Sequence, residues 1–404
     1  MRILMAHNYY QQRGGEESIF ETEAGLLELN GHIVDRYTVH NDQVEGANPF
    51  TLAADTLWNQ KIYRDLRRVI RQNQPQVVHF QNTFPLISPA AYYAVKAEGL
   101  PVIQTLHNYR LLCPNALFFR EGKVCVDCLG KSIPIPGVIH GCYRNSHVAS
   151  AGVAAMLGLH SLLKTWSLTV DAFIVYSQFA MNKFIAGGLP PEKLLFKTNS
   201  LHPVPDVGLG RGGYALFVGR LSVEKGLGVM LKAWEQLNGR IPLKIVGDGP
   251  MLPLVKDAQA RIPGVEWLGR QSLDEVYRLM GEASFLVFPS EWYETFGRVA
   301  VEAFSKGTPV IAANIGAISE LVTPNRTGLH FRASDPDDLV AQVEWALEHP
   351  EKMALMRQEA RIEFETKYTT DANYQRLVEI YHQAQANTLK STSNKVTPVS
   401  SANL

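Results

Sequence analysis

The sequence has no excess charge of either sign, because its Lys and Arg residues number 39 and its Asp and Glu residues also number 39. This balance argues against nucleic acid as a partner, since nucleic-acid-binding chains carry a basic surface. No apolar run approaches the ~20 residues that a helix needs to cross a bilayer. The first residues already have the apolar pattern of a strand and lack the features of a secretory signal. With only four cysteines a disulfide framework is not expected, and we predict a cytoplasmic protein.

The chain is too long for one typical core, so two domains are expected from its 404 residues. A Pro- and Gly-rich linker over 203–213 is the predicted boundary. On both sides of it, short apolar strands alternate with helical patterns, which indicates an α/β fold with parallel sheets. We predict a first domain over 1–202, a second over 214–368, a helix over 369–387 and a disordered Ser/Thr/Asn-rich tail over 388–404.

The most informative stretch covers residues 288–312, where a strand ends at Pro289 and a helical pattern begins after Gly297. A helix that starts directly after a strand presents free backbone N–H groups, which bind anions. Glu294 and Glu302 flank this start and would hold hydroxyl groups rather than phosphate. The stretch therefore predicts a ligand that combines a sugar with a phosphate.

Arg220 and Lys225 follow the predicted strand over 214–218, in the loop and first turn of the next helix. Cations are unfavourable at a helix N-terminus unless an anion lies between them and the helix dipole. This position favours a bound phosphate. Asp335 and Asp337 have the D-x-D spacing of metal-dependent sugar-nucleotide enzymes, but their place at a helix start predicts a capping role instead.

In the first half of the chain, two further candidate sites follow the ends of predicted strands. Gly14 and Gly15 follow the strand over 2–6 and would let the backbone approach a phosphate closely, although most glycine pairs only form turns. His107 follows the strand over 102–106, and ligands of open α/β sheets bind outside the carboxyl ends of strands. The alternative for His107 is a capping or loop histidine.

All four cysteines lie in a segment that interrupts the alternation of strands and helices, residues 109–147. Cys113, Cys125, Cys128 and Cys142 have the spacing C-x11-C-x2-C-x13-C. Four thiolates can hold a tetrahedral structural zinc ion, which leaves no open position for catalysis. The alternative is four free thiols.

Two further stretches bear on membrane contact. Lys61, Arg64, Arg68 and Arg71 would form one stripe on a helix, either a solvated face or a site for anionic lipid. Residues 148–170 read as one long apolar helix that is buried or contacts a membrane. A peripheral place at the inner face of the plasma membrane is the corresponding expectation.

Taken together, the motifs resemble glycosyltransferase family 4. The motifs that carry the resemblance are Gly14-Gly15-x-Glu17, Gly219-Arg-Leu…Glu-Lys-Gly226, Gly247-Asp-Gly-Pro250 and the pair Glu294/Glu302 with Phe296-Gly297 between them. The sequence departs from the family at Gly316-Ala317, where a second glycine is common. The resemblance implies the GT-B architecture, in which two Rossmann-like doubly wound domains face each other across a cleft and the last helix crosses back to the first domain.

The resemblance also implies a retaining, metal-independent hexosyltransferase that moves a sugar from a UDP- or GDP-sugar to a saccharide or lipid-linked saccharide in cell-surface polysaccharide synthesis. Arg220 and Lys225 would neutralise the donor diphosphate, Glu294 would bind the donor sugar, and His107 would face that sugar. The remaining donor-binding positions are Gly14, Gly15, Gly219, Gly247, Phe296, Gly297, Glu302 at the ribose, and Arg270 and Gln271 near the nucleobase. A sugar-nucleotide epimerase and a non-catalytic sugar-nucleotide-binding scaffold are the alternatives.

Overall fold

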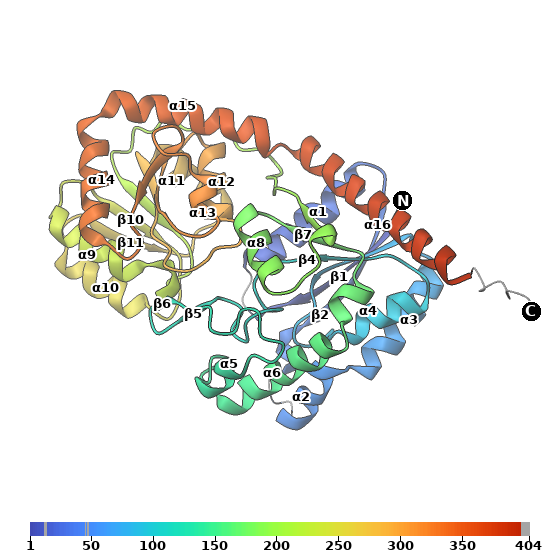
Figure 1. Ribbon diagram of the computed structural model, residues 1–404. Helices are drawn as coiled ribbons and strands as arrows, with labels where there is room; N and C mark the ends of the chain where they lie inside the picture. The colour runs from blue at the N-terminus through green and yellow to red at the C-terminus, as the bar shows by residue number, and fades with distance from the viewer. Residues whose placement is uncertain (12–13, 45, 47, 397–404) are drawn as a thin grey trace, which may run out of the picture.

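The computed structural model describes residues 1–11, 14–44, 46 and 48–396, and these form two α/β domains (Figure 1). The first domain contains a six-stranded parallel sheet in the order β2-β1-β3-β4-β7-β8. Its strands are β1 (Arg2–Tyr9), β2 (Ile33–His40), β3 (Val77–Asn82), β4 (Val102–Thr105), β7 (Ala172–Val175) and β8 (Leu194–Phe196). Its main helices are α1 (Gly15–Leu29), α2 (Pro49–Leu57), α3 (Gln60–Asn73), α4 (Ala90–Ala97) and α8 (Gln178–Ala186).

The second domain repeats this plan with a parallel sheet in the order β11-β10-β9-β12-β13-β14. Its strands are β9 (Ala215–Val218), β10 (Leu243–Val246), β11 (Val265–Gly269), β12 (Phe285–Phe288), β13 (Val310–Ala313) and β14 (Gly328–Phe331). Its helices are α9 (Leu227–Leu237), α10 (Leu252–Arg261), α11 (Leu273–Glu282), α12 (Arg298–Ser305), α13 (Ile318–Leu321), α14 (Pro336–Glu348) and α15 (Pro350–Lys367). The predicted pair of doubly wound parallel-sheet domains is confirmed.

Each sheet has a point where the chain reverses the direction in which it adds strands. In the second sheet, β10 and β11 extend on one side of β9, while β12, β13 and β14 extend on the other. The loops that follow the carboxyl ends of β9 and β12 therefore diverge from each other. Open α/β sheets bind ligands at such a point. These two loops carry Lys225 and Glu294. In the first sheet the equivalent point lies between β1 and β3.

The cysteine-containing insert has little regular structure. It contains a short antiparallel pair, β5 (Phe119–Arg120) and β6 (Lys123–Val124), and the helix α5 (Ile135–Ile139). The single helix predicted over 148–170 is wrong. The chain instead forms α6 (His147–Leu162) and α7 (Thr165–Thr169), because Lys164 between them takes a left-handed conformation with φ 53° that no helix accommodates.

The linker lies along the second domain rather than hanging free. Backbone N–H groups of Gly208, Gly210 and Gly212 donate to the carbonyls of Lys306, Gly281 and Glu282. A Cβ atom on Gly208 would lie 2.1 Å from Cα of Gly281. The glycines of the linker thus permit close backbone packing.

The last helix, α16 (Thr370–Val396), returns to the first domain as predicted (Figure 1). Its side chains Leu377, Ile380, Tyr381 and Ala384 are fully buried. The hydroxyl of Tyr381 lies 2.8 Å from Nδ1 of His79 on β3. The helix runs beyond the predicted start of the disordered tail at residue 388, and residues 397–404 lie outside the described part of the chain.

Candidate active site

The carboxylate of Glu294 is the centre of the second domain's site. It is buried in the loop after β12, and its Oε1 accepts hydrogen bonds from Lys225 Nζ (2.5 Å), Trp292 Nε1 (2.9 Å) and Ser290 Oγ (3.0 Å). These three donors hold the carboxylate in one orientation. Because all three bind the same oxygen, Oε2 remains available to hydroxyl groups of a ligand.

Lys225 and Glu294 come together because the backbones of their two loops pack directly against each other. Gly226 adopts φ 72°, and a Cβ atom there would lie only 1.7 Å from the carbonyl oxygen of Pro289. The N–H of Glu291 also donates to the carbonyl of Glu224 at 2.9 Å. The Lys-Gly sequence after β9 therefore positions the ammonium group beside the end of β12.

Gly219 and Gly247, which were predicted to bind the donor, lie after β9 and β10 and pack backbone against backbone. Gly247 has φ 140°, and a Cβ atom there would lie 1.9 Å from the carbonyl oxygen of Gly219. The N–H of Leu221 donates to the carbonyl of Asp248 at 2.9 Å. Arg220 lies exposed in this loop, and its guanidinium has no hydrogen bond or ion pair within the described ranges. It is a cation available to a ligand.

Glu302 has a partner that the sequence analysis missed. Arg298, one helical turn earlier on α12, donates from Nε to Oε1 of Glu302 at 2.9 Å. Burial raises the pKa of Glu302, and the Arg298 guanidinium opposes that rise. Gly297 caps α12 with φ 103°, a conformation that favours glycine. The amide groups of this helix start therefore face the same end of the sheet as Glu294.

Arg270 and Gln271 lie at a distance from this centre in the fold. They follow β11, an edge strand that β10 and β9 separate from β12. Both side chains are exposed, with Arg270 Nε 3.8 Å from a carboxylate oxygen of Asp248 and Gln271 donating to the carbonyl of Leu268. Their predicted place near the nucleobase stays a prediction.

The loop after β12 also touches the first domain. The hydroxyl of Thr295 donates to the backbone carbonyl of His107 at 2.7 Å, and the hydroxyl of Ser177 donates to the carbonyl of Thr295 at 3.0 Å. The rings of Phe296 and His107 each lie 5.6 Å from the ring of Tyr176. The structure therefore brings His107 next to the segment that carries Glu294.

The imidazole of His107 is held neutral and in one tautomer. Its Nε2 lies 2.6 Å from Oε1 of Gln81, whose Nε2 donates to a carboxylate oxygen of Glu23 at 2.6 Å. Because the Gln81 amide nitrogen donates to Glu23, the atom of Gln81 that faces His107 is Oε1, which can only accept. Nε2 of His107 therefore carries the proton. Burial lowers the pKa of His107 to about 3. Lys197, fully buried, neutralises Glu23 at 2.7 Å.

In the first loop, Glu17 organises the backbone. Its carboxylate accepts from the N–H of Gly14 (2.7 Å) and of Tyr10 (3.0 Å). This contact fixes the turn that starts α1. Among the described residues, nothing lies within 4 Å of the place that a Cβ atom on Gly15 would take. This place is available to a ligand, while Glu17 itself is committed to the loop.

A polar cluster beside His107 was also missed. Asn108 donates to Oε1 of Glu16 at 2.8 Å, and the guanidinium of Arg110 lies 4.2 Å from the ring centre of Phe84 and 5.0 Å from that of Tyr143. Burial raises the pKa of Glu16 to about 7, although the hydrogen bond from Asn108 acts against the rise. The cluster lies on the first domain, beside His107.

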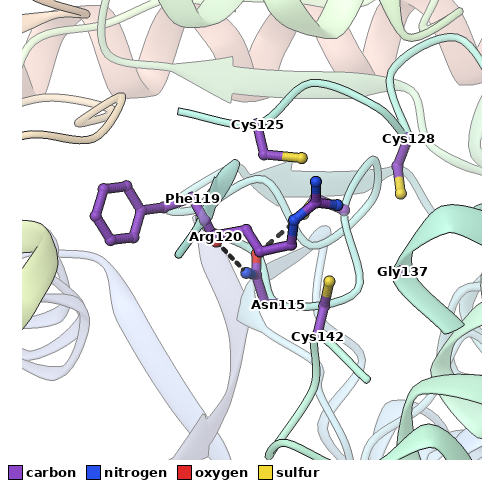
Figure 2. A pocket seen from close by; sticks show the side chains of 8 residues that line it. Asn115, Phe119, Arg120, Cys125, Cys128, Gly137 and Cys142 are labelled. Carbon is purple, nitrogen blue, oxygen red and sulfur yellow. Dashed lines mark hydrogen bonds between the residues drawn. The ribbon is translucent and has the colours of Figure 1, made fainter. Parts of the chain in front are cut away.

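The four cysteines of the insert line one small cavity, and Figure 2 shows Cys125, Cys128 and Cys142 around it. The cavity has a volume of about 10 Å³, and its lining also includes Asn115, Phe119, Arg120 and Gly137. Burial raises the pKa of the Cys128 thiol to about 12 and also raises that of Cys113. Within the described ranges no three His, Cys, Asp or Glu side chains are placed to hold a metal ion. Zinc binding by this insert stays a prediction.

Two remaining predictions concern single positions. Asp335 is the N-cap of α14, where its side chain accepts from the N–H of Asp338 at 3.0 Å, so the predicted capping role is confirmed. At the family's Gly-Gly position, Gly316 has φ 59° whereas Ala317 has φ −67°. Only the first of these conformations favours glycine. Ala317 is therefore compatible with the backbone.

Comparison with known proteins agrees with this fold. An uncharacterized glycosyltransferase of Methanocaldococcus jannaschii is 34% identical over 136 residues, which cover 33% of this chain and 38% of that protein. The sulfoquinovosyl transferase of Arabidopsis thaliana is 31% identical over 306 residues, covering 73% of this chain and 54% of that protein. The chain thus spans about half or less of the length of these relatives.

A solved structure of the Anabaena protein HepE with UDP and glucose matches with a TM-score of 0.66 at 18% identity, covering 93% of this chain and 98% of that one. The family described as Glycosyltransferase Family 4 matches residues 8–195, and the family described as Glycosyl transferases group 1 matches residues 210–363. The two matches cover both domains in order, and the chain belongs to glycosyltransferase family 4.

Proposed function

We propose that this protein transfers a sugar from a nucleoside-diphosphate donor to a hydroxyl group of a saccharide or lipid-linked saccharide, with retention of configuration at the anomeric carbon. The observation that carries the proposal is the Lys225–Glu294 pair, 2.5 Å apart at the switch point of the second sheet. A cation for phosphate and a carboxylate for hydroxyl groups are the two recognition chemistries that a sugar nucleotide requires.

Each part of the donor has a matching group. Arg220, Lys225 and the first amides of α12 stabilise the negative charge that develops on the leaving diphosphate. Oε2 of Glu294 accepts from hydroxyl groups of the donor sugar. Glu302, held by Arg298, lies along the same helix and takes the ribose hydroxyl groups. The chain's own cations thus supply the electrostatic stabilisation.

The transfer step breaks the bond between the anomeric carbon and the phosphate oxygen and forms a bond to the acceptor oxygen on the same face. The acceptor proton passes to the departing phosphate oxygen. Neutral His107, with its proton on Nε2, presents a polar but uncharged group to the transferred sugar. Glu16, Asn108 and Arg110 bind the acceptor on the first domain.

One solved structure supports the donor class, and one relative supports sugar transfer. HepE was solved with UDP and glucose, and the Arabidopsis thaliana relative is a sulfoquinovosyl transferase. UDP is the first donor nucleotide to test, and GDP is the second. A cytoplasmic enzyme that builds cell-surface polysaccharide at the inner face of the plasma membrane is the corresponding cellular role.

Two variants test the proposal. Lys225→Ala and Glu294→Ala each remove one half of the pair, and Lys232→Ala removes an exposed lysine of the neighbouring helix α9 as a control. A screen of UDP- and GDP-sugars by thermal stabilisation first identifies the donor. Sugar transfer should fall by at least about 100-fold in both site variants and stay unchanged in the control.

Near-normal transfer by both folded variants would contradict the proposal. Conversion of the donor sugar without any acceptor would indicate an epimerase instead. Donor binding without turnover across a range of saccharide and lipid-linked acceptors would indicate a non-catalytic scaffold.

A further inference from the structure

One end of the first domain exposes an unusual amount of apolar surface. Nine of the 23 large hydrophobic side chains that the described residues expose lie between positions 126 and 168. They are Val126, Ile133, Ile135, Ile139, Val148, Leu159, Leu162, Leu163 and Leu168. Figure 1 shows α5 and α6 side by side at the lower edge of this domain, next to α2.

Helix α6 is apolar on both of its faces. One face packs into the domain through Val153, Met156 and Leu157, which are buried. Apart from His147 at the helix start, the exposed side chains of α6 are small or apolar, namely Val148, Ala151, Ala155, Leu159 and Leu162. A helix that is apolar all round normally has apolar surroundings on every side. The outer face of α6 is therefore suited to an apolar partner.

Helix α5 extends this outer face. Ile133, which precedes α5, packs on α6 at Gly158, where a Cβ atom would lie 3.0 Å from its Cγ1. Ile135 and Ile139 remain 51% and 64% exposed. We name the exposed small and apolar residues from α5 to α7 the α5–α7 face and define it as Ile133, Ile135, Ile139, Val148, Ala151, Ala155, Leu159, Leu162, Leu163 and Leu168.

The charge of this segment identifies the partner. Between residues 129 and 170 the sequence contains no Asp or Glu, while Lys131, Arg144 and Lys164 are exposed. Apolar side chains bordered by cations match the interface of a bilayer with anionic headgroups. A second copy of the chain fits less well, since a two-fold contact would bring the same cations against each other.

The basic stripe on α3 fits this role less well than expected from the sequence. Arg68 pairs with Asp65 at 2.9 Å, and Arg71 pairs with Glu98 at 3.0 Å. These carboxylates neutralise part of the stripe. Within the described ranges no helix is long and apolar enough to cross a membrane, so any contact is interfacial.

We propose that the α5–α7 face docks onto an anionic phospholipid bilayer. The inference deepens the proposed function and rests on it, because it makes the acceptor a lipid-linked molecule reached from the membrane surface. The insert connects the face to the site, since Tyr143 between α5 and α6 contacts Arg110 beside Glu16 and Asn108.

Vesicle flotation tests the inference without donor or acceptor. The full chain is mixed with vesicles of phosphatidylcholine alone or of phosphatidylcholine with phosphatidylglycerol. We expect it to float with the anionic vesicles. Leu159→Glu/Leu162→Glu should lower the bound fraction at least tenfold, and Lys131→Glu/Lys164→Glu should lower it for anionic vesicles. The control Leu355→Glu/Ile362→Glu alters side chains of similar exposure on α15 and should bind like the wild type.

Failure of the wild type to float, or equal binding by all variants, would overturn the inference. A concentration-dependent dimer that Leu159→Glu/Leu162→Glu converts to monomer would assign the face to a second copy instead. Thermal stabilisation by the donor, measured on the same samples, reports on the donor site separately. A wild-type chain that binds the donor but does not float with anionic vesicles would overturn the docking face alone and leave the proposed function standing.

Discussion

The hydroxyl of Thr295 in the second domain donates a 2.7 Å hydrogen bond to the backbone carbonyl of His107 in the first. This bond joins the loop that carries Glu294 to the carboxyl end of β4. Both residues are buried at the contact. The bond therefore holds the loop of Glu294 next to His107 across the two domains.

Thr295→Val should remove this bond while keeping the side-chain shape. A hydrogen bond of this kind contributes about 1 kcal/mol, so kcat/KM should fall roughly fivefold. Steady-state kinetics with the identified donor measures the effect. Thr366→Val is the control, because in the described part of the chain the hydroxyl of Thr366 bonds only to the carbonyl of Ile362 within α15. Equal kinetics for the two variants would show that the contact does not matter for turnover.

Glu16 predicts a pH dependence of stability. Burial raises its pKa from 4.5 to about 7 in the folded protein. A carboxyl with a raised folded pKa contributes stability at low pH that is lost as the pH rises from its unfolded to its folded value. Glu16→Gln should therefore be more stable than the wild type above pH 7, by about 1–2 kcal/mol for a partly exposed group.

Urea unfolding at a series of pH values measures this difference, which should disappear below about pH 4. In kinetics, ionisation near pH 7 should appear in the wild-type profile and be missing in Glu16→Gln. A stability difference that does not change with pH would contradict the assignment.

The buried pair of Lys197 and Glu23 predicts a large stability effect. Burial acts to raise the pKa of Glu23, and the Lys197 ammonium nonetheless leaves it below its ordinary value. Lys197→Met would leave an uncompensated carboxylate and should cost about 3–5 kcal/mol of unfolding free energy. The double variant Glu23→Gln/Lys197→Met should recover part of that loss, measured by denaturant unfolding. No recovery would mean that packing, rather than charge, dominates at this site.

The four cysteines of the insert lead us to predict a bound zinc ion. The four thiols surround one cavity, and a metal would require their side chains to move closer together than in this arrangement. We expect elemental analysis of protein purified without chelator to find about one zinc ion per chain. The variant Cys125→Ser/Cys128→Ser should lose the metal and destabilise the insert. Metal-free protein with four thiols that react with a thiol reagent would end this proposal.

Much of the fold could be predicted because the central strands are continuous apolar runs bounded by Gly and Pro. The edge strand β2 was missed, since its exposed and half-buried residues alternate without a long apolar run. The break between α6 and α7 was missed because the left-handed conformation of Lys164 is set by packing and has no glycine to signal it.

The same distinction applies to the site. Lys225 and Glu294 could be predicted because each follows a strand end, and parallel strands share one ligand-binding edge. The i, i+4 spacing of Arg298 and Glu302 is typical of an ion pair on a helix, so this pair could also have been predicted. The Lys197–Glu23 and Thr295–His107 contacts join residues far apart in the sequence, and no local pattern identifies such partners.

The return of α16 bears on the order in which the protein matures. Four fully buried side chains of the first domain's core, Leu377, Ile380, Tyr381 and Ala384, come from the end of the chain. Domains usually fold as they emerge during synthesis, with the N-terminal one first. Here the ribosome must complete residues 370–384 before the first domain can fill its core, so the second domain is expected to reach its native packing first.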